Sequence, residues 1–567
     1  YIKEGKFIIG PWYILQDEFY TSGEANIRNL LVGMKEAEKY GAMCKMGYFP
    51  DAFGNAGQMP QLLKQAGMDT VTFGRGVRPV GFDNEVQENG NYESPYSEMM
   101  WESPDGTKIF GILFANWYNN GNEVPTDKKI AKEYWDDRLK KVATFASTDE
   151  YLLMNGCDHQ PVQADLGKAI EVASELYPDI NFKHSNFPEY IKAIKEKVPN
   201  DLAVVKGELT SQDTDGWSTL MNCASSHIYL KQMNRKCELA LENGAEPVRV
   251  LSSVLGQNYP SDELEYSWKK LMQNHPHDSI CCCSVDEVQD EMATRFNKSK
   301  QVADYLVSEG KRYIADKINT KEYEKYKNVL PFVVFNTTGR ERTSVVSVEI
   351  DVTRKSGWLK KCAYDLDEIN VPNYKLIDSD GNSIPFKIED LGVKFGYDLP
   401  KDKFRQPYMA RRVRVTFEAE NISAVGYKTY ALVEGDTEKV TDTLVSSENC
   451  MENDAIRVEI NKNGSLNVTD KASGRTYKGV AYYEETGDLG NEYMYKMPEG
   501  SKAITTQDTV AKIELAEDEP YRAMYKITNT ITVPKSGDDN FEDEKSHMVF
   551  FKERVGGRSN DTVEMKI

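Results

Sequence analysis

The hydrophobic pattern changes its period twice along this 567-residue chain, and these changes limit the folds that the chain can adopt. In residues 1–197, short apolar runs such as "CKMGYFP" and "TVTFG" alternate with amphipathic segments such as "EANIRNLLVGMKEAEKYG". Alternation of this kind is typical of a mainly parallel sheet covered by helices. We therefore predict an N-terminal α/β domain, similar to a β/α barrel, over residues 1–197.

The rest of the chain divides into a helical and a β region. A helical period dominates residues 198–327, where Val288, Met292 and Phe296 recur every fourth residue in a long helix predicted from Ser284. From residue 328 to 567 apolar residues alternate with polar ones, as in "RRVRVTFEAE" and "IRVEINKNGSLNVTD". These patterns predict a multidomain protein with a central helical bundle over residues 198–327 and a C-terminal β-sandwich over residues 328–567.

Two turn signals lie in the β region. Asn463 and Gly464 stand between alternating residues, which predicts a hairpin whose turn has positive φ at both central positions. The segment "DSDGN" at residues 378–382 shares part of a calcium-loop pattern, but the remaining ligand spacing is absent. We interpret that segment as a plain turn.

Charge and cysteine content narrow the choice of partners and compartment. The formal net charge of -20 argues against nucleic acid or an anionic membrane surface as the partner. No apolar run approaches the roughly 18 residues that cross a bilayer. The nine cysteines are irregularly spaced, and three are consecutive, which does not suit a disulfide framework. We expect a cytoplasmic protein that acts on a small substrate, and a homo-oligomer is compatible with the sequence.

Asp51 ends the apolar run "CKMGYFP" and precedes a short helix predicted over Met59–Ala66, with Pro60 in its first turn. This pattern places Asp51 at the carboxyl end of a strand in a βαβ unit, where α/β sheets collect their active sites. For an isolated loop aspartate, helix capping or a structural role in the loop is the more common explanation.

Asp158 and His159 follow a second predicted strand, "EYLLMNG", and precede a helix. Two carboxylates on two such loops can face each other across a pocket, as glycoside hydrolysis requires of its nucleophile or base and its acid. Capping of the following helix explains Asp158 and His159 equally well.

A third polar cluster is "NHPHDSICCC", in which His275, His277 and Asp278 stand close together. Imidazole and carboxylate together suit zinc, although both histidines could also cap or pack in a loop. We interpret the three adjacent cysteines as buried filler, because neighbouring side chains diverge and do not easily converge on one ion.

Blocks of the sequence, taken in order, resemble the signature segments of glycoside hydrolase family 38, the retaining zinc-dependent α-mannosidases. The resemblance is to the bacterial branch that includes mannosylglycerate hydrolase, and it covers roughly residues 1–320. The segments that carry it are "IIGPWYILQDEF", "GEANIRNLL", "GYFPDAFGNAGQMPQLLKQAGM", "NGCDHQ" and "NHPHDSICCCSVDEVQDEMATRF". It implies hydrolysis of terminal α-linked mannose in a mannoside or oligosaccharide, through a covalent glycosyl-enzyme intermediate.

The resemblance also implies roles for individual residues. It makes Asp51 both nucleophile and zinc ligand, His277 a second zinc ligand and Asp158 the general acid/base, and it gives His275 no role. Arg75 is the candidate for an arginine that lines the sugar site, and His159 is placed with the substrate-binding residues. Three aromatic residues are candidates for stacking on the sugar, although each could equally pack in the core: Trp12, Trp117 and Tyr118.

The sequence departs from the family pattern at its first zinc ligands. In the family these come from a His-x-Asp motif on the first strand, but no histidine precedes His159 here. We expect that strand to lie upstream of residue 1, and we expect the C-terminal sandwich to be truncated. Without the strand, the sequence supplies two of the four expected protein ligands, which predicts weak zinc binding.

The alternatives are a mannosylglycerate or 6-phosphomannosylglycerate hydrolase and a non-catalytic carbohydrate-binding homologue. A polysaccharide deacetylase is a more distant alternative, and it would release acetate instead of free sugar.

Overall fold

The structure is a computed structural model that describes most of the chain. It describes residues 1–567 except residues 42, 78–92, 212–219, 401, 437–441, 490–492, 494, 499, 501, 537–556 and 567. The chain divides into two compact units. Unit 1 comprises Tyr1–Val250, Asn258–Ser308 and Gly490–Tyr495, and unit 2 comprises Leu251–Gln257, Glu309–Leu489 and Lys496–Ile567.

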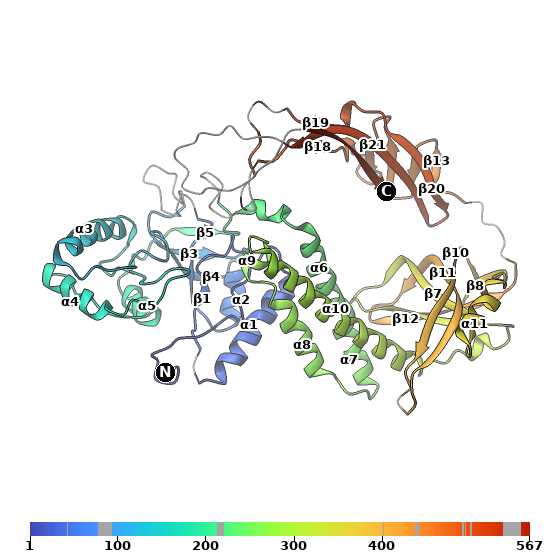
Figure 1. The fold of residues 1–567 in the computed structure, drawn as a ribbon, viewed down its shortest axis with the longest axis horizontal. Helices are drawn as coiled ribbons and strands as arrows, with labels where there is room; N and C mark the ends of the chain where they lie inside the picture. Colours follow the sequence, from blue (N-terminus) through green and yellow to red (C-terminus); the bar gives the residue numbers. More distant parts are fainter. Residues whose placement is uncertain are drawn as a thin grey trace. The chain divides into compact units, whose positions relative to one another are not determined.

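Unit 1 contains a five-stranded sheet with the order β1-β2-β4-β3-β5 (Figure 1). Its strands are β1 (Gly47–Phe49), β2 (Thr70–Phe73), β3 (Glu98–Glu102), β4 (Lys108–Leu113) and β5 (Val204–Lys206). The pairs β1/β2, β2/β4 and β3/β5 are parallel, and β3/β4 is antiparallel. The predicted mainly parallel sheet is therefore confirmed. The described strands form an open sheet, so closure into a barrel stays a prediction.

The core of unit 1 lies against this sheet. All four residues of β2 are buried, and α2 (Met59–Gln65) places Met59 and Leu63 in the same core. Pro60 occupies the first turn of α2, as predicted, where its missing N–H has no helical partner to lose. Ser22 caps the N-terminus of helix α1 (Gly23–Glu38), because its hydroxyl accepts a hydrogen bond from the amide of Ala25.

Three further helices accompany the sheet: α3 (Lys128–Phe145), α4 (Leu166–Leu176) and α5 (Phe187–Lys195). Helices α3 and α4 share a small core around Trp135 and Ala169, whereas α5 packs Ile194 against Phe110 of β4.

The segment "EYLLMNG" at residues 150–156 forms no strand, so that prediction is wrong. Asn120 and Gly121 hold this segment instead: the Asn120 side chain bonds to Leu152 and Met154, and the Gly121 amide donates to the Met154 carbonyl. Hydrogen bonds from the loop at Asn120 and Gly121 thus replace the ladder that the apolar pattern predicted.

The predicted helical bundle is confirmed. Its helices are α6 (Ile228–Leu239), α7 (Glu246–Val254), α8 (Ser261–Met272), α9 (His277–Ile280) and α10 (Asp286–Ala315), with a 3₁₀ turn at Met221–Ser225 and a π-helical turn at Ala240–Ala245. Leu230, Trp268 and Phe296 are among the buried side chains that the helices share. Helix α10 begins two residues after Ser284, whose buried hydroxyl has no hydrogen-bond partner. None of the described helices is long and apolar enough to cross a membrane.

Unit 2 contains two antiparallel sheets that share a core. One has the order β10-β11-β7 and the other β6-β12-β8-β9. Side chains such as Val415, Phe417 and Leu432 fill the core between them, which gives the predicted sandwich architecture. The strands are β6 (Leu330–Asn336), β7 (Arg342–Lys355), β8 (Tyr374–Asp378), β9 (Ser383–Ile384), β10 (Phe386–Asp398), β11 (Gln406–Ile422) and β12 (Gly426–Glu434), with a 3₁₀ turn at Lys321–Tyr323 and helix α11 (Leu359–Asp367).

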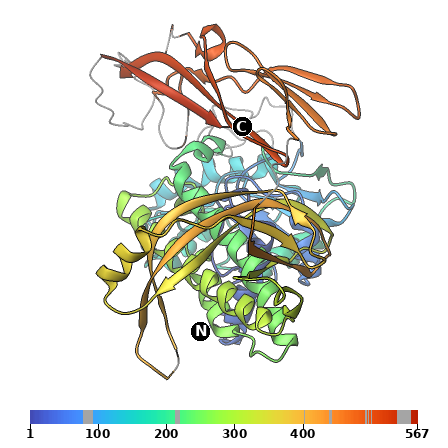
Figure 2. The ribbon, with the colours of Figure 1, turned by 90° about the vertical axis from the view of Figure 1, so that its right-hand side faces the viewer.

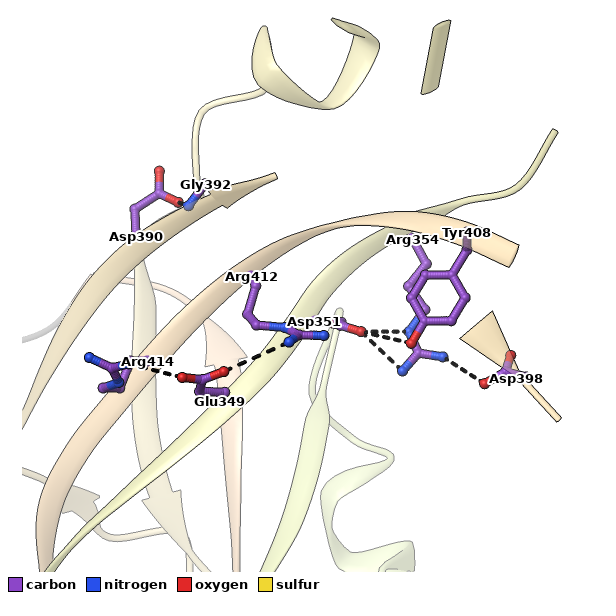
Figure 3. A network of polar contacts seen from close by, with 9 residues as sticks. All are labelled: Glu349, Asp351, Arg354, Asp390, Gly392, Asp398, Tyr408, Arg412 and Arg414. Carbon is purple, nitrogen blue, oxygen red and sulfur yellow. Dashed lines mark hydrogen bonds and ion pairs between the residues drawn. The ribbon is translucent and has the colours of Figure 1, made fainter. Parts of the chain in front are cut away.

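The long strands β7, β10 and β11 run side by side (Figure 2) and carry charged pairs on one face (Figure 3). Arg412 bonds to Asp351 at 2.7 Å and Arg414 bonds to Glu349 at 2.9 Å, both across the β7/β11 ladder. The alternating neighbours Val413 and Val415 are buried. Cross-strand pairs of opposite charge therefore line one face while apolar residues fill the other.

A second group of antiparallel strands has its own core around Val458, Leu466 and Ile527. Its strands are β13 (Val445–Ser447), β14 (Cys450–Glu452), β15 (Ile456–Ile460), β16 (Leu466–Asp470), β17 (Thr476–Val480), β18 (Glu484–Glu485), β19 (Ile504–Thr505), β20 (Lys512–Glu519), β21 (Arg522–Ser536) and β22 (Gly557–Lys566), with a 3₁₀ turn at Thr506–Asp508. Among the residues that the structure describes, the β region thus has two separate large cores where the sequence predicted one sandwich.

Both turn predictions can be compared with the structure. Strands β15 and β16 form the predicted hairpin, but only Gly464 of its central pair has a positive φ, +82°. The Gly464 amide bonds to Asn461, and the turn is longer than the predicted two-residue loop. At residues 378–382 the Asp378 carboxylate accepts the amides of Asp380 and Asn382, so the plain turn is confirmed.

Gly33 in α1 provides a test of the packing in unit 1. A Cβ atom there would lie 2.2 Å from the Pro11 carbonyl oxygen, whereas a Cβ at Gly23, in the same helix, would meet nothing within 4 Å. Alanine normally favours a helix over glycine by about 1 kcal/mol. We expect Gly33→Ala nevertheless to lower the free energy of unfolding by about 1–3 kcal/mol, because overpacking costs more than propensity contributes. Urea denaturation should show no such loss for Gly23→Ala, and equal behaviour of both variants would contradict the packing.

Candidate active site

Asp51 lies directly after β1, at the carboxyl end of the parallel strands, as the sequence predicted. The end of β2 lies close to the Asp51 loop, since a Cβ at Gly74, the residue after β2, would lie 2.1 Å from the Pro50 carbonyl oxygen. The Asp51 side chain is 18% exposed. One carboxylate therefore stands at a sheet edge, largely shielded from water.

Arg75 follows β2 and pairs with Asp51. Its Nε donates to Asp51 Oδ1 at 2.6 Å, and its Nη2 contacts the same oxygen. The guanidinium lies 5.3 Å from the ring centre of Phe53 and 4.9 Å from that of Trp117. Burial opposes ionisation of Asp51, but the charge of Arg75 and the hydrogen bond with His277 outweigh it and lower the pKa of Asp51. Asp51 is thus held as a carboxylate.

His277 opens α9 and faces the other carboxylate oxygen. Its Nε2 lies 3.6 Å from Asp51 Oδ2, and its Nδ1 lies 3.2 Å from the Leu15 carbonyl oxygen. Burial lowers the pKa of His277, but the hydrogen bond and charge of Asp51 raise it to about 9. Asp51 and His277 therefore form a carboxylate–imidazolium pair, which a metal ion would have to deprotonate in order to bind.

His275 points elsewhere. It is 1% exposed, its Nε2 lies 2.7 Å from Asn234 Oδ1 on α6, and burial lowers its pKa to about 3. The packing alternative is therefore the observed one for His275.

The fit to zinc is partial. Asp51 and His277 present the carboxylate oxygen and imidazole nitrogen that zinc accepts, with their donor atoms close together. Across the residues that the structure describes, no group of three or more His, Cys, Asp or Glu side chains could hold a metal ion. Zinc ligation by Asp51 and His277 therefore stays a prediction.

Asp158 lies in an exposed loop, where the Tyr118 hydroxyl donates to its Oδ2 at 2.7 Å. The ring centre of Tyr118 lies 4.3 Å from that of Trp117, and the backbone of Trp117 has a strained φ of +66°. Burial raises the pKa of Tyr118, as do the charges of Asp51 and Asp158. The loop after β4 therefore places Tyr118 within the electrostatic reach of both carboxylates.

The remaining predicted residues are placed differently. Trp12 is 8% exposed and packs in the core with its ring centre 5.0 Å from that of Phe49, which matches the packing alternative. Trp117 is half-buried beside Arg75. His159 is exposed with a φ of +59°, and its place among substrate-binding residues stays a prediction.

The three adjacent cysteines do not all diverge. Cys282 has a positive φ of +69°, and this conformation brings Cys281 Sγ to 3.2 Å from Cys283 Sγ. Cys281 and Cys282 are buried, in agreement with their interpretation as filler.

Two buried acids near the site received no role from sequence reasoning. Asp17 is 0% exposed and burial raises its pKa to about 7, whereas His277 and Lys231 act to lower it. Glu18 is 3% exposed, and burial raises its pKa well above its usual value. Their position just beyond the apolar run "GPWYIL" was the available signal, but acidic residues are seldom fully buried, so sequence reasoning made no prediction for them.

Family comparisons cover most of the chain. Residues 1–218 match the family "Glycosyl hydrolases family 38 N-terminal domain", residues 218–314 match "Alpha mannosidase middle domain", and residues 327–434 match "Glycosyl hydrolases family 38 C-terminal domain 1".

Individual relatives give the same picture. The chain is 44% identical to the "Putative mannosylglycerate hydrolase" of Halalkalibacterium halodurans over 100% of this chain and 64% of that protein. It is 24% identical to human "Alpha-mannosidase 2C1" over 54% of this chain and 27% of the human protein. The crystal structure of an alpha-mannosidase from Enterococcus faecalis V583 matches with a TM-score of 0.90 and 44% identity, over 100% of this chain and 63% of that one. The chain thus spans somewhat less than two thirds of the length of the H. halodurans and E. faecalis proteins.

The depressed pKa of His275 predicts a pH dependence of stability. In the unfolded chain this histidine has the ordinary pKa of 6.5, whereas in the folded protein its pKa is about 3. Between these two pH values the unfolded state therefore binds a proton at His275 and the folded state does not. The free energy of unfolding should fall over this window by up to about 1.4 kcal/mol per pH unit. We expect His275→Gln to make the decline between pH 7 and 5 shallower in urea denaturation, and His184→Gln, at an exposed site, to leave it unchanged. Parallel declines in wild type and His275→Gln would refute this expectation.

Proposed function

Since the chain belongs to glycoside hydrolase family 38, we propose that it carries the nucleophile and the acid/base of a retaining α-mannosidase. The observation that supports this most directly is Asp51, which Arg75 and His277 hold ionised at the carboxyl end of a parallel sheet. An ionised, shielded carboxylate is what nucleophilic attack on a sugar requires.

In the proposed mechanism Asp51 attacks the anomeric carbon while Asp158 protonates the leaving oxygen. In the second half-reaction Asp158 takes a proton from water, and that water hydrolyses the glycosyl-enzyme with net retention. Retaining enzymes place the two carboxyl groups about 5–5.5 Å apart, and we propose the same for the substrate-bound form.

Tyr118 supports the acid/base in this scheme. Its hydroxyl donates to Asp158 Oδ2, which fixes the orientation of an otherwise exposed side chain. Because Trp117 packs on both Tyr118 and Arg75, one aromatic residue ties the two halves of the proposed site together.

We further propose that Asp51 and His277 are zinc ligands. When bound, the metal would supply a Lewis acid that holds two sugar hydroxyls and favours a flattened ring. The pairing of His277 with Asp51 keeps both donor atoms oriented toward each other, and ligation requires His277 to lose its proton. The resemblance assigns the other two ligands to a His-x-Asp motif that residues 1–158 do not contain, since His159 is the first histidine.

The natural substrate has two candidates, because the relative from H. halodurans bears the name of a mannosylglycerate hydrolase and the one from E. faecalis that of an alpha-mannosidase. We propose a mannoside in either case, with mannosylglycerate or its 6-phosphate as the second candidate. All nine cysteines are free thiols, which supports a bacterial cytoplasmic location.

The proposed activity can be tested on the complete gene product. We expect release of free sugar from an aryl α-mannoside, loss of this activity with a chelator and recovery with zinc. Parallel assays with mannosylglycerate identify the preferred substrate by kcat/KM. Chelator-resistant cleavage would refute the metal requirement, and a protein inactive on every mannoside would support the non-catalytic alternative.

Substitutions at the two carboxylates test the mechanism. Asp51→Asn removes the nucleophile and should abolish turnover, and Asp158→Asn should lower kcat by about 10²- to 10⁴-fold through loss of acid/base catalysis. Asp179→Asn, at an exposed aspartate, should leave turnover unchanged. NMR of the wild-type reaction should show α-mannose as the first product. Full activity of Asp51→Asn, or β-mannose as the first product, would overturn the mechanism.

A further inference from the structure

Residues Leu15–Glu18, which we call the bracket segment, contact both loops that carry the proposed site. On one side Gln16 forms an antiparallel bridge with Pro276, and the Asp17 amide donates to the His275 carbonyl oxygen at 3.1 Å. The His277 amide donates to the Leu15 carbonyl oxygen at 3.2 Å. The backbone of the bracket segment thus holds the stretch that ends in His277.

On the other side the bracket segment reaches the Asp51 loop through a side chain. Glu18 Oε2 accepts the amide of Ala56 at 2.6 Å. Ala56 lies five residues after Asp51, and the intervening Asn55 pairs through its backbone with Leu209. The loop is therefore held by Arg75 where it begins and by Glu18 where it ends.

Glu18 occupies a costly position. It is 3% exposed, and its second oxygen, Oε1, is buried without a hydrogen-bond partner. Burying a carboxyl group with only part of its hydrogen bonds satisfied destabilises a fold. Glu98 in the same unit shows the satisfied case, because Ser97 and Ser147 donate to its two oxygens. Only one of the two Glu18 oxygens gains a hydrogen bond, so stability alone accounts poorly for an acid at this position.

We propose that Glu18 is a positioning residue that fixes the Asp51 loop, through Ala56, in register with His277. The inference rests on the proposed function, because it concerns the same carboxylate and imidazole. Asp51 belongs to a sheet loop and His277 to the helical bundle, and their facing atoms stand 3.6 Å apart. The bracket segment bonds to both loops and so sets this separation. Loss of the Ala56 hydrogen bond would free the Asp51 loop from the bracket segment.

Three variants of the complete gene product test the proposal. Glu18→Gln keeps a carbonyl oxygen of the same shape for the Ala56 amide, and Glu18→Leu removes the acceptor. Glu98→Leu is the matched control, since it removes an equally buried acceptor of the Ser147 amide, away from Asp51 and His277. If Glu18→Leu fails to fold, Glu18→Asp, which withdraws the acceptor by one methylene, takes its place with a smaller expected effect.

The first measurement follows the hydrogen bond itself. Hydrogen–deuterium exchange of the Ala56 amide should accelerate at least tenfold in Glu18→Leu and stay at the wild-type rate in Glu18→Gln and Glu98→Leu. Unchanged exchange in Glu18→Leu, or equal acceleration in Glu98→Leu, would overturn the proposal.

The second measurement follows the consequence for the site. Competition with a chromogenic chelator should show the zinc Kd of Glu18→Leu raised about 10–100-fold, the usual effect of losing a group that supports a metal ligand. Glu18→Gln should stay within about threefold of wild type, and Glu98→Leu should lose stability without losing affinity. A wild-type zinc Kd in Glu18→Leu would refute the positioning role. A wild type that binds zinc but cleaves no α-mannoside would refute the proposed function, while exchange and zinc affinity would still decide the role of Glu18.

Discussion

The paired charges of Asp51, Arg75 and His277 are the interaction on which the rest of the site depends. An isolated carboxylate this well shielded would take up a proton, because burial disfavours its charged form. The guanidinium on one oxygen and the imidazole on the other reverse that preference. The proposed chemistry needs the resulting anion, so the fold must deliver both partners to it.

Three structural features deliver them. The parallel pairing of β1 and β2 brings the loops that carry Asp51 and Arg75 side by side at one edge of the sheet. Helix α9 presents His277 from the bundle, and the bracket segment bonds to the same stretch of chain. Rings of Phe53 and Trp117 flank the guanidinium and restrict its orientation. The pair therefore depends on contacts between the sheet and the bundle and not on any one element.

Local reasoning succeeded where short-range patterns decide the outcome. The apolar runs before Asp51 and Arg75 form parallel strands. The short helix after Asp51 forms as predicted, with Pro60 in its first turn and Gly67 just after its end. It failed where an apolar run met a competing partner: residues 150–156 bond to Asn120 and Gly121 and do not join the sheet. It gave no role to Asp17 and Glu18, because acidic side chains are seldom fully buried.

By itself the sequence determined the three regions, the position of Asp51 at a strand end and the candidate partners Asp158 and His277, because periodicity and residue type act over a few neighbouring residues. Tertiary structure alone decided that His277 stands 3.6 Å from Asp51, that Tyr118 holds Asp158, and that Glu18 bonds to the Asp51 loop. Those outcomes depend on burial and on charges brought together from segments up to about two hundred residues apart, and they have no local signature in the chain.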